Sequence, residues 1–299
     1  MNMKKSKGVG TFFTVPVIIA ILILGLIAIS SIFAPLITTY DPVAVDMGNA
    51  LAGFSAEHIL GTDAVGRDQF TRLLYGARTS LLNAFLVICI SIAVGVPLGL
   101  ICGYYRGKVD AVIMKLWDFI LSFPSLLLAF VLVAAFGRGA SKAVIATGII
   151  YIPMLSKLTR SICMTEKKKV YVEACKSLGY SDMRILFGHI LKNCIPMLMA
   201  EITLDFGYAI MSLASLSFLG LGVQAPTADW GSMLEEGLQY LLQRPLSAMI
   251  PAIAIVITIT CVNILADGIQ MYLDPDQRKL PTFKKLERKL KGRRLHGNC

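Results

Sequence analysis

The residues best placed for chemistry in this chain are carboxylates within apolar segments. Glu201 and Asp205 stand four positions apart, so a helix would carry both on one face, where like charges repel. Carboxylates inside apolar spans usually face a cavity or a partner. The pair therefore either meets basic residues of neighbouring helices or lines a polar path through the protein. Asn263 and Asp267 have the same two interpretations.

A second cluster, Asp63, Arg67 and Asp68, combines both signs of charge in a segment rich in Pro and Gly. These side chains either form a local ion-pair network or contact another protein. His58 lies close by in the sequence, and as a lone histidine it is expected to be solvated rather than to bind a metal.

Catalytic chemistry is not indicated. The sequence has no nucleophile–base pair, no cluster of metal ligands and no Gly-x-x-x-x-Gly-Lys-Ser/Thr phosphate loop. We therefore expect no catalytic residue, no metal site and no bound cofactor. The seven cysteines include no Cys-x-x-Cys pair, and we interpret them as free, small apolar residues.

Long uncharged stretches of the sequence predict the membrane-spanning segments that position these side chains. Apolar residues make up 56% of the 299, and charged residues only 16%. About 20 apolar residues cross the hydrocarbon core of a bilayer. The sequence predicts six spans, at Phe12 to Pro35, Thr79 to Tyr105, Phe119 to Gly137, Ala143 to Ser156, Phe206 to Ala228 and Pro245 to Ala266. A separate short helix is expected near Gln69 to Tyr75.

The basic residues orient these spans. If the N-terminus is cytoplasmic, 23 Lys and Arg lie inside and 6 outside, so both termini are predicted to be cytoplasmic. The net charge of +10 is then mainly a topology signal. Attraction of the basic C-terminal tail to anionic lipid is favoured over binding of nucleic acid.

The longest cytoplasmic loop predicts a helical hairpin. Tyr171, Ala174, Cys175 and Leu178 recur at helical spacing, and Gly179 is suited to the left-handed residue that ends a helix. Ser181 and Asp182 can then cap a second helix from Met183 to Leu191. Such a hairpin is either a solvated linker or a docking site for a soluble partner.

This hairpin resembles a known sequence motif. Glu173-Ala174-Cys175-Lys176-Ser177-Leu178-Gly179, followed by Ile185 to Pro196, is similar to the EAA loop of bacterial ABC-importer permeases, with Cys175 where the family has Ala. Further segments look like the dipeptide, oligopeptide and nickel permeases, namely Leu60-Gly61-Thr62-Asp63, Gly66-Arg67-Asp68, Ser217 to Gly222, Trp230-Gly231 and Leu273-Asp274-Pro275. The resemblance covers roughly residues 35 to 275 and is nearest to the C-type permease of that family.

The resemblance implies an all-α integral membrane protein with six transmembrane helices and the type I ABC importer permease fold. It implies a heterodimer with a related B-type permease, two ATPase subunits that carry ATP and Mg, and an extracytoplasmic substrate-binding protein, in the bacterial inner membrane. Coupling to the ATPase is expected at Tyr171, Glu173, Ala174, Cys175, Leu178 and Gly179. The translocation path is expected at Glu201, Asp205 and Asn263, and contacts of the outside loop with partners at Asp63, Arg67 and Asp68.

The same resemblance divides the chain into four parts. Residues 1–34 hold the cytoplasmic N-terminus and the first span, 35–80 the extracytoplasmic loop, 81–272 the permease core with the EAA-like loop at 157–196, and 273–299 the basic tail. Short peptides and nickel or a metal chelate both remain possible substrates. A secondary transporter and a membrane assembly scaffold are the alternatives, and neither would need the ATPase-docking loop.

Overall fold

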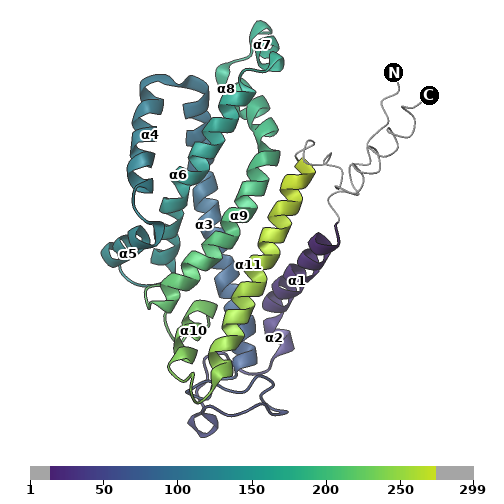
Figure 1. Ribbon diagram of the computed structural model, residues 1–299, viewed down its shortest axis with the longest axis vertical. Helices are drawn as coiled ribbons and strands as arrows, with labels where there is room; N and C mark the ends of the chain where they lie inside the picture. Colours follow the sequence, from purple (N-terminus) through teal and green to yellow (C-terminus); the bar gives the residue numbers. More distant parts are fainter. Residues whose placement is uncertain (1–13, 274–299) are drawn as a thin grey trace, which may run out of the picture.

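The computed structural model of the protein describes residues 14–273. The N-terminal lysines, the basic tail and Asp274-Pro275 lie outside the described residues. The described chain folds into a bundle of helices (Figure 1). In chain order the helices are α1 (Val15–Ile32), α2 (Ala34–Ile37), η2 (Met47–Asn49), α3 (Gln69–Tyr105), α4 (Gly107–Leu121), α5 (Ser125–Phe136), α6 (Ala140–Glu166), α7 (Val170–Ser177), α8 (Asp182–Ile185), η3 (Leu186–Ile190), α9 (Leu191–Phe218), α10 (Trp230–Leu238) and α11 (Pro245–Leu273).

Five helical units in the described part are long and apolar enough to cross a membrane, namely α1, α3, α6, the continuous run Asp182–Phe218 and α11. The pair α4 and α5 makes a sixth if its two helices form one span. The prediction of an all-α protein is confirmed. The predicted number of six membrane spans is reached in the described part if α4 and α5 together form one span.

The third predicted span is not the straight helix expected from Phe119 to Gly137. It is broken between α4 and α5, which meet at 93°. Pro124 stands at the break. Proline has no backbone N–H and pushes the residue before it out of the helical region, so the helix cannot continue through this point.

α3 is longer than predicted. The short helix expected near Gln69 to Tyr75 and the following span are one helix of 37 residues, because nothing between them interrupts it. Asp68 caps its start by accepting a hydrogen bond from Thr71 N at 2.7 Å. At 1.5 Å per residue α3 is about 55 Å long, and it runs from the end of the molecule that carries the loop between α2 and α3 to the end that carries α7 (Figure 1).

α3 and α6 pack backbone to backbone. A Cβ atom added at any of three glycines of α3 would lie between 2.4 and 2.9 Å from a backbone oxygen of α6. The tightest position is Gly99 against Ser156 O. Small residues spaced by four allow transmembrane helices to approach this closely, and here they are Gly95, Gly99 and Gly103.

The fifth span lies earlier in the chain than predicted. The helix ends at Phe218, and residues 219–228, which the prediction included in the span, form a loop. Gly220 adopts a left-handed conformation (φ +72°) just after the helix end. The helix instead begins near Asp182. The charges of Lys192, Glu201 and Asp205 masked its apolar character in the sequence.

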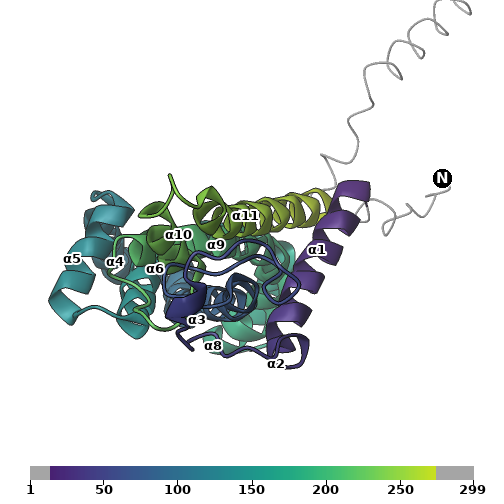
Figure 2. The same cartoon turned by 90° about the horizontal axis from the view of Figure 1, so that it is seen from below.

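Viewed from the loop end, α4 and α5 lie on one flank of the bundle and α1 on the opposite flank (Figure 2). The last turn of α11 lies nearer the end of the bundle that carries α7, whereas α1 begins about midway along the bundle and runs away from that end (Figure 1). The long loop between α2 and α3 lies at the other end, beside α10. The molecule therefore presents two ends, which we call the hairpin end and the loop end.

Candidate coupling and translocation sites

At the hairpin end, α7 is closed by the glycine that the sequence singled out. Gly179 is left-handed (φ +76°) and its N–H donates to Lys176 O at 2.9 Å. Tyr180 N donates to Cys175 O at 3.1 Å. These two bonds form a Schellman motif, which satisfies the last carbonyl groups of the helix. The predicted end of the first hairpin helix is confirmed.

The second hairpin helix differs from the prediction. Ser181 precedes α8 without a side-chain cap bond. The chain then passes through a π-helical turn, η3, directly into α9. The hairpin therefore consists of the short helix α7 and a second arm, α8 and η3, which continues into the membrane-spanning helix α9. This second arm cannot move independently of α9.

The predicted coupling residues face two ways. Cys175 is buried and Tyr171 is half-buried, so both pack toward the bundle. Four others are exposed at the tip, namely Glu173, Ala174, Leu178 and Gly179. Sequence reasoning missed the apolar side chains of Val170 and Met183, which are 78% and 53% exposed beside them. Their apolar character within a charged loop was the signal.

Tyr171 anchors α7 to the end of α6. Its hydroxyl donates to Glu166 Oε2 at 3.1 Å, and Lys169 Nζ pairs with the other oxygen of the same carboxylate. Burial raises the pKa of Tyr171 to about 12, so the hydroxyl is protonated at neutral pH. Tyr171 thus fixes the helix, whereas the exposed side chains beside it are free to meet a partner.

Glu201 and Asp205 lie in the middle of α9, not at the edge of a span. Asp205 is 2% exposed, and its Oδ2 has no hydrogen-bond partner among the described residues. Glu201 lines a cavity of about 610 Å³ together with Gln270 and Asn193. No described Lys or Arg forms an ion pair with either carboxylate, so the expectation of basic neighbours is wrong for this part of the chain.

Asn263 lies on α11 where that helix packs against α9. A Cβ added at Gly207 would lie 3.2 Å from Asn263 Oδ1, so the amide fills the space that the missing side chain leaves. The structure therefore places Asn263 at a helix contact with Gly207, two residues after Asp205 in α9.

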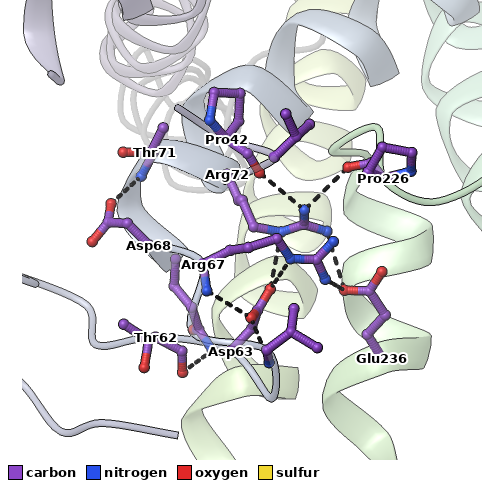
Figure 3. A network of polar contacts seen from close by, with 12 residues as sticks. Pro42, Thr62, Asp63, Arg67, Asp68, Thr71, Arg72, Pro226 and Glu236 are labelled. Carbon is purple, nitrogen blue, oxygen red and sulfur yellow. Dashed lines mark hydrogen bonds and ion pairs between the residues drawn. The ribbon is translucent and has the colours of Figure 1, made fainter. Parts of the chain in front are cut away.

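At the loop end the structure brings four charged side chains together (Figure 3). Arg67 Nε lies 2.6 Å from Asp63 Oδ2, and its Nη2 lies 2.6 Å from Glu236 Oε2 of α10. Arg72, which is 1% exposed, lies 3.4 Å from Asp63 and 3.1 Å from Glu236. Arg72 also donates to the carbonyl oxygen of Pro226 at 3.3 Å. We call Asp63, Arg67, Arg72 and Glu236 the loop-end network.

The predicted ion pair of Asp63 with Arg67 is present. Glu236 was not predicted as a partner of Arg67, because the two residues lie 169 positions apart in the chain. Asp68 caps α3, and its Oδ1 also accepts a hydrogen bond from His58 Nδ1 at 3.0 Å. His58 is 9% exposed, so the expectation of a solvated histidine is wrong.

α10 connects the loop end to three spans. Asp229 caps it by accepting from Gly231 N at 3.0 Å, and Ser80 Oγ of α3 donates to the same carboxylate at 2.7 Å. Burial raises the pKa of Asp229 above its ordinary value. Trp230 is buried and donates to Leu73 O at 3.0 Å. The Trp-Gly pair noted in the sequence therefore positions α10 against the bundle.

The chain can be compared with known proteins on this basis. Residues 95–279 match the family described as the binding-protein-dependent transport system inner membrane component. The chain belongs to this family. Among its relatives, the dipeptide transport permease DppC of Alkalihalophilus pseudofirmus is 40% identical over 261 residues, 86% of each chain. The glutathione transport permease GsiD of Escherichia coli is 40% identical over 257 residues, 86% of this chain and 85% of that one.

A solved structure supports the fold independently. The inward-facing MetNI methionine ABC transporter contains a chain that superposes with a TM-score of 0.56 at 16% identity. The match covers 67% of this chain and 94% of that one. The bundle thus has the fold of a type I ABC importer permease, as predicted.

Membership of this family decides between the functional classes that the sequence left open. The chain is a permease subunit of a binding-protein-dependent ABC importer, and it works with ATPase subunits and a substrate-binding protein. It is an inner-membrane transport component, and ATP hydrolysis belongs to the separate ATPase subunits. The interpretations as a secondary transporter or an assembly scaffold are thereby replaced.

Proposed function

We propose that this permease subunit imports short peptides. The observation that carries the proposal is the set of relatives with peptide transport in their names, dipeptide, di/tripeptide and glutathione, each matched over about 85% of this chain at 38–40% identity. Nickel or a metal chelate, the other substrate class that the sequence left open, has no comparable support among these relatives.

Coupling to the ATPase is proposed at the exposed tip of the hairpin end. Four residues are exposed there, namely Glu173, Ala174, Leu178 and Gly179. Tyr171 and Cys175 pack toward the bundle and hold α7 in place. Exposed apolar and small side chains allow another protein's groove to approach a helix closely. Because α8 continues into α9, a push on this tip reaches a membrane span directly.

The assembly proposed around this chain has one related B-type permease, two ATPase subunits and one substrate-binding protein. ATP and Mg belong on the ATPase subunits, with no cofactor on this chain. The hairpin end and both termini face the cytoplasm, in keeping with the charge bias of 23 basic residues to 6. The basic tail meets anionic lipid there. The loop held by Asp63, Arg67 and Asp68 forms the surface that the binding protein meets.

The proposed path through the membrane passes the cavity beside Glu201. A peptide carries a cationic amino group, and a carboxylate facing a cavity offers it a complementary charge. Asp205 and Asn263 belong to the walls that shape this path. Their side chains are packed against neighbouring helices, so their contribution is to position α9 and α11.

The test is uptake by the reconstituted assembly. Both permeases, the ATPase subunits and the binding protein are placed in vesicles, and uptake of labelled alanyl-alanine is followed with and without ATP. ATP-dependent uptake supports the proposal. Uptake of Ni²⁺ but not of the dipeptide would overturn the substrate class alone, and absence of any ATP-dependent uptake across a panel of short peptides and Ni²⁺ would overturn the proposed function.

A further inference from the structure

Tyr104, in the last turn of α3, touches the chain on both sides of α7. Its hydroxyl donates to Asp182 Oδ1 at 2.5 Å, at the start of α8. Its carbonyl oxygen accepts from Lys167 Nζ, just before α7. The ammonium group of Lys176, within α7, lies 5.7 Å from the centre of the ring, and that of Lys167 lies 4.8 Å from it.

These contacts hold a short helix at three points from one buried residue. Tyr104 is 2% exposed and belongs to a core that also contains Val172 of α7 and Ile185 of α8. A ring face attracts cations, and a hydrogen bond to a carboxylate is stronger than one between neutral groups. The orientation of α7 is therefore fixed relative to α3 as well as to α9.

α3 is itself held along its length. The glycines at 95, 99 and 103 bring its backbone against α6 on the approach to Tyr104. At its other end Arg72 is buried in the loop-end network. A displacement at the loop end thus has a continuous, packed helix along which to reach the residue that holds α7.

We infer that Tyr104 is a positioning residue for coupling, which orients α7 so that the state of the loop end is transmitted to the ATPase. The inference rests on the proposed role of the hairpin tip. A purely structural core residue would need only the ring, whereas this role also needs the hydroxyl, since that group holds α8 through Asp182.

The first experiment measures the hairpin directly in the assembled transporter. Hydrogen exchange of residues 170–185 is compared between the wild type and Tyr104→Phe, with Tyr105→Phe as the matched control because Tyr105 is the exposed neighbouring tyrosine. Losing a bond to a charged group is expected to accelerate exchange in 170–185 roughly tenfold, equivalent to about 1.4 kcal/mol, and to leave 69–95 unchanged.

The second experiment measures coupling. In vesicles, Tyr104→Phe and Asp182→Ala should each lower the stimulation of ATP hydrolysis by the loaded binding protein, while basal hydrolysis and copurification of the ATPase subunits persist. The double variant should be no worse than either single variant, because both remove one bond. Alanyl-alanine taken up per ATP hydrolysed should fall in parallel.

The outcomes separate the two claims. If the wild type shows no ATP-dependent uptake, the proposed function fails, and the exchange experiment still decides whether Tyr104 orients the hairpin. If the wild type transports and Tyr104→Phe keeps both its exchange pattern and its coupling ratio, the inference is wrong. Equal losses in Tyr104→Phe and Tyr105→Phe would likewise overturn it.

Discussion

The regions at the two ends of α3 differ in which side chains they bury and which they expose. At the loop end, four charged side chains are turned inward and satisfy one another, with Arg72 almost fully buried. At the hairpin end, apolar and small side chains are turned outward, with Val170 78% and Leu178 72% exposed. A soluble monomer usually exposes its charged side chains and buries its apolar ones.

The difference shows where each end finds its partners. Buried charges are stable only when paired, and those of the loop end have their partners in this chain. Exposed apolar side chains are stabilised when another surface covers them, and in the proposed function the ATPase covers those of the hairpin end. The charges of the loop-end network are therefore satisfied within the isolated chain, while the exposed tip of the hairpin end is the surface that we propose is covered in the assembly.

The largest effect is expected from a charge placed on the hairpin tip. Ala174→Arg should abolish ATP-driven uptake, because a long cation occupies the space that a groove of the ATPase would need. The free energy of unfolding should change by no more than about 0.5 kcal/mol, since the position is exposed. Uptake in vesicles and thermal unfolding in detergent measure the two quantities.

The matched control is Ala56→Arg, which makes the same substitution at an exposed alanine of the loop between α2 and α3, away from the hairpin end. Gly179→Asp is a second variant expected to fail in transport, since the left-handed conformation of this residue also disfavours a side chain. Normal transport by Ala174→Arg would show that the tip is not a docking surface.

The loop end should respond in the opposite way. Arg72→Gln leaves Asp63 and Glu236 without one of their partners, and breaking a buried pair costs about 3–5 kcal/mol. The expected result is a lower unfolding temperature and faster proteolysis of the loop end, in the isolated subunit as well as in the assembly. Arg78→Gln is the control, because Arg78 lies on the same helix and is exposed. Equal stability of the two variants would contradict the comparison.

How far the sequence predicted this structure depends on the distance over which each feature is determined. The end of α7 was predictable because Gly179 and its neighbours determine it locally. The six apolar segments were recognisable from composition, but their boundaries were not. The fifth span, for example, was predicted to begin after Asp205, whereas this ionisable residue is buried within the helix. Glu236 could not be assigned to the loop-end network, since only the packing of α10 against α3 brings it there.

Between the two ends, the contact of α3 with α6 offers an intermediate effect. Gly99→Ala should destabilise the protein by about 1–3 kcal/mol, because its Cβ would lie 2.4 Å from Ser156 O and the helices would have to separate. Gly25→Ala, in α1, is the control, since no atom lies within 4 Å of the added Cβ. Thermal unfolding in detergent distinguishes them. If both variants unfold alike, the two helices are not in the close contact described.

The smallest effects are expected from the carboxylates in the middle of α9, and they separate a cavity residue from a packed one. Glu201→Gln removes the charge that faces the cavity of about 610 Å³, so uptake of alanyl-alanine should fall several-fold while stability is unchanged. Asp205→Asn replaces a buried carboxyl without a partner for Oδ2 by a neutral group of the same shape, so transport should persist and stability should rise slightly. Leu204→Met, at a residue that lines the same cavity as Glu201, controls for the general effect of substitution. If Asp205→Asn instead lowers uptake and Glu201→Gln does not, the path passes Asp205 and not the cavity that Glu201 lines.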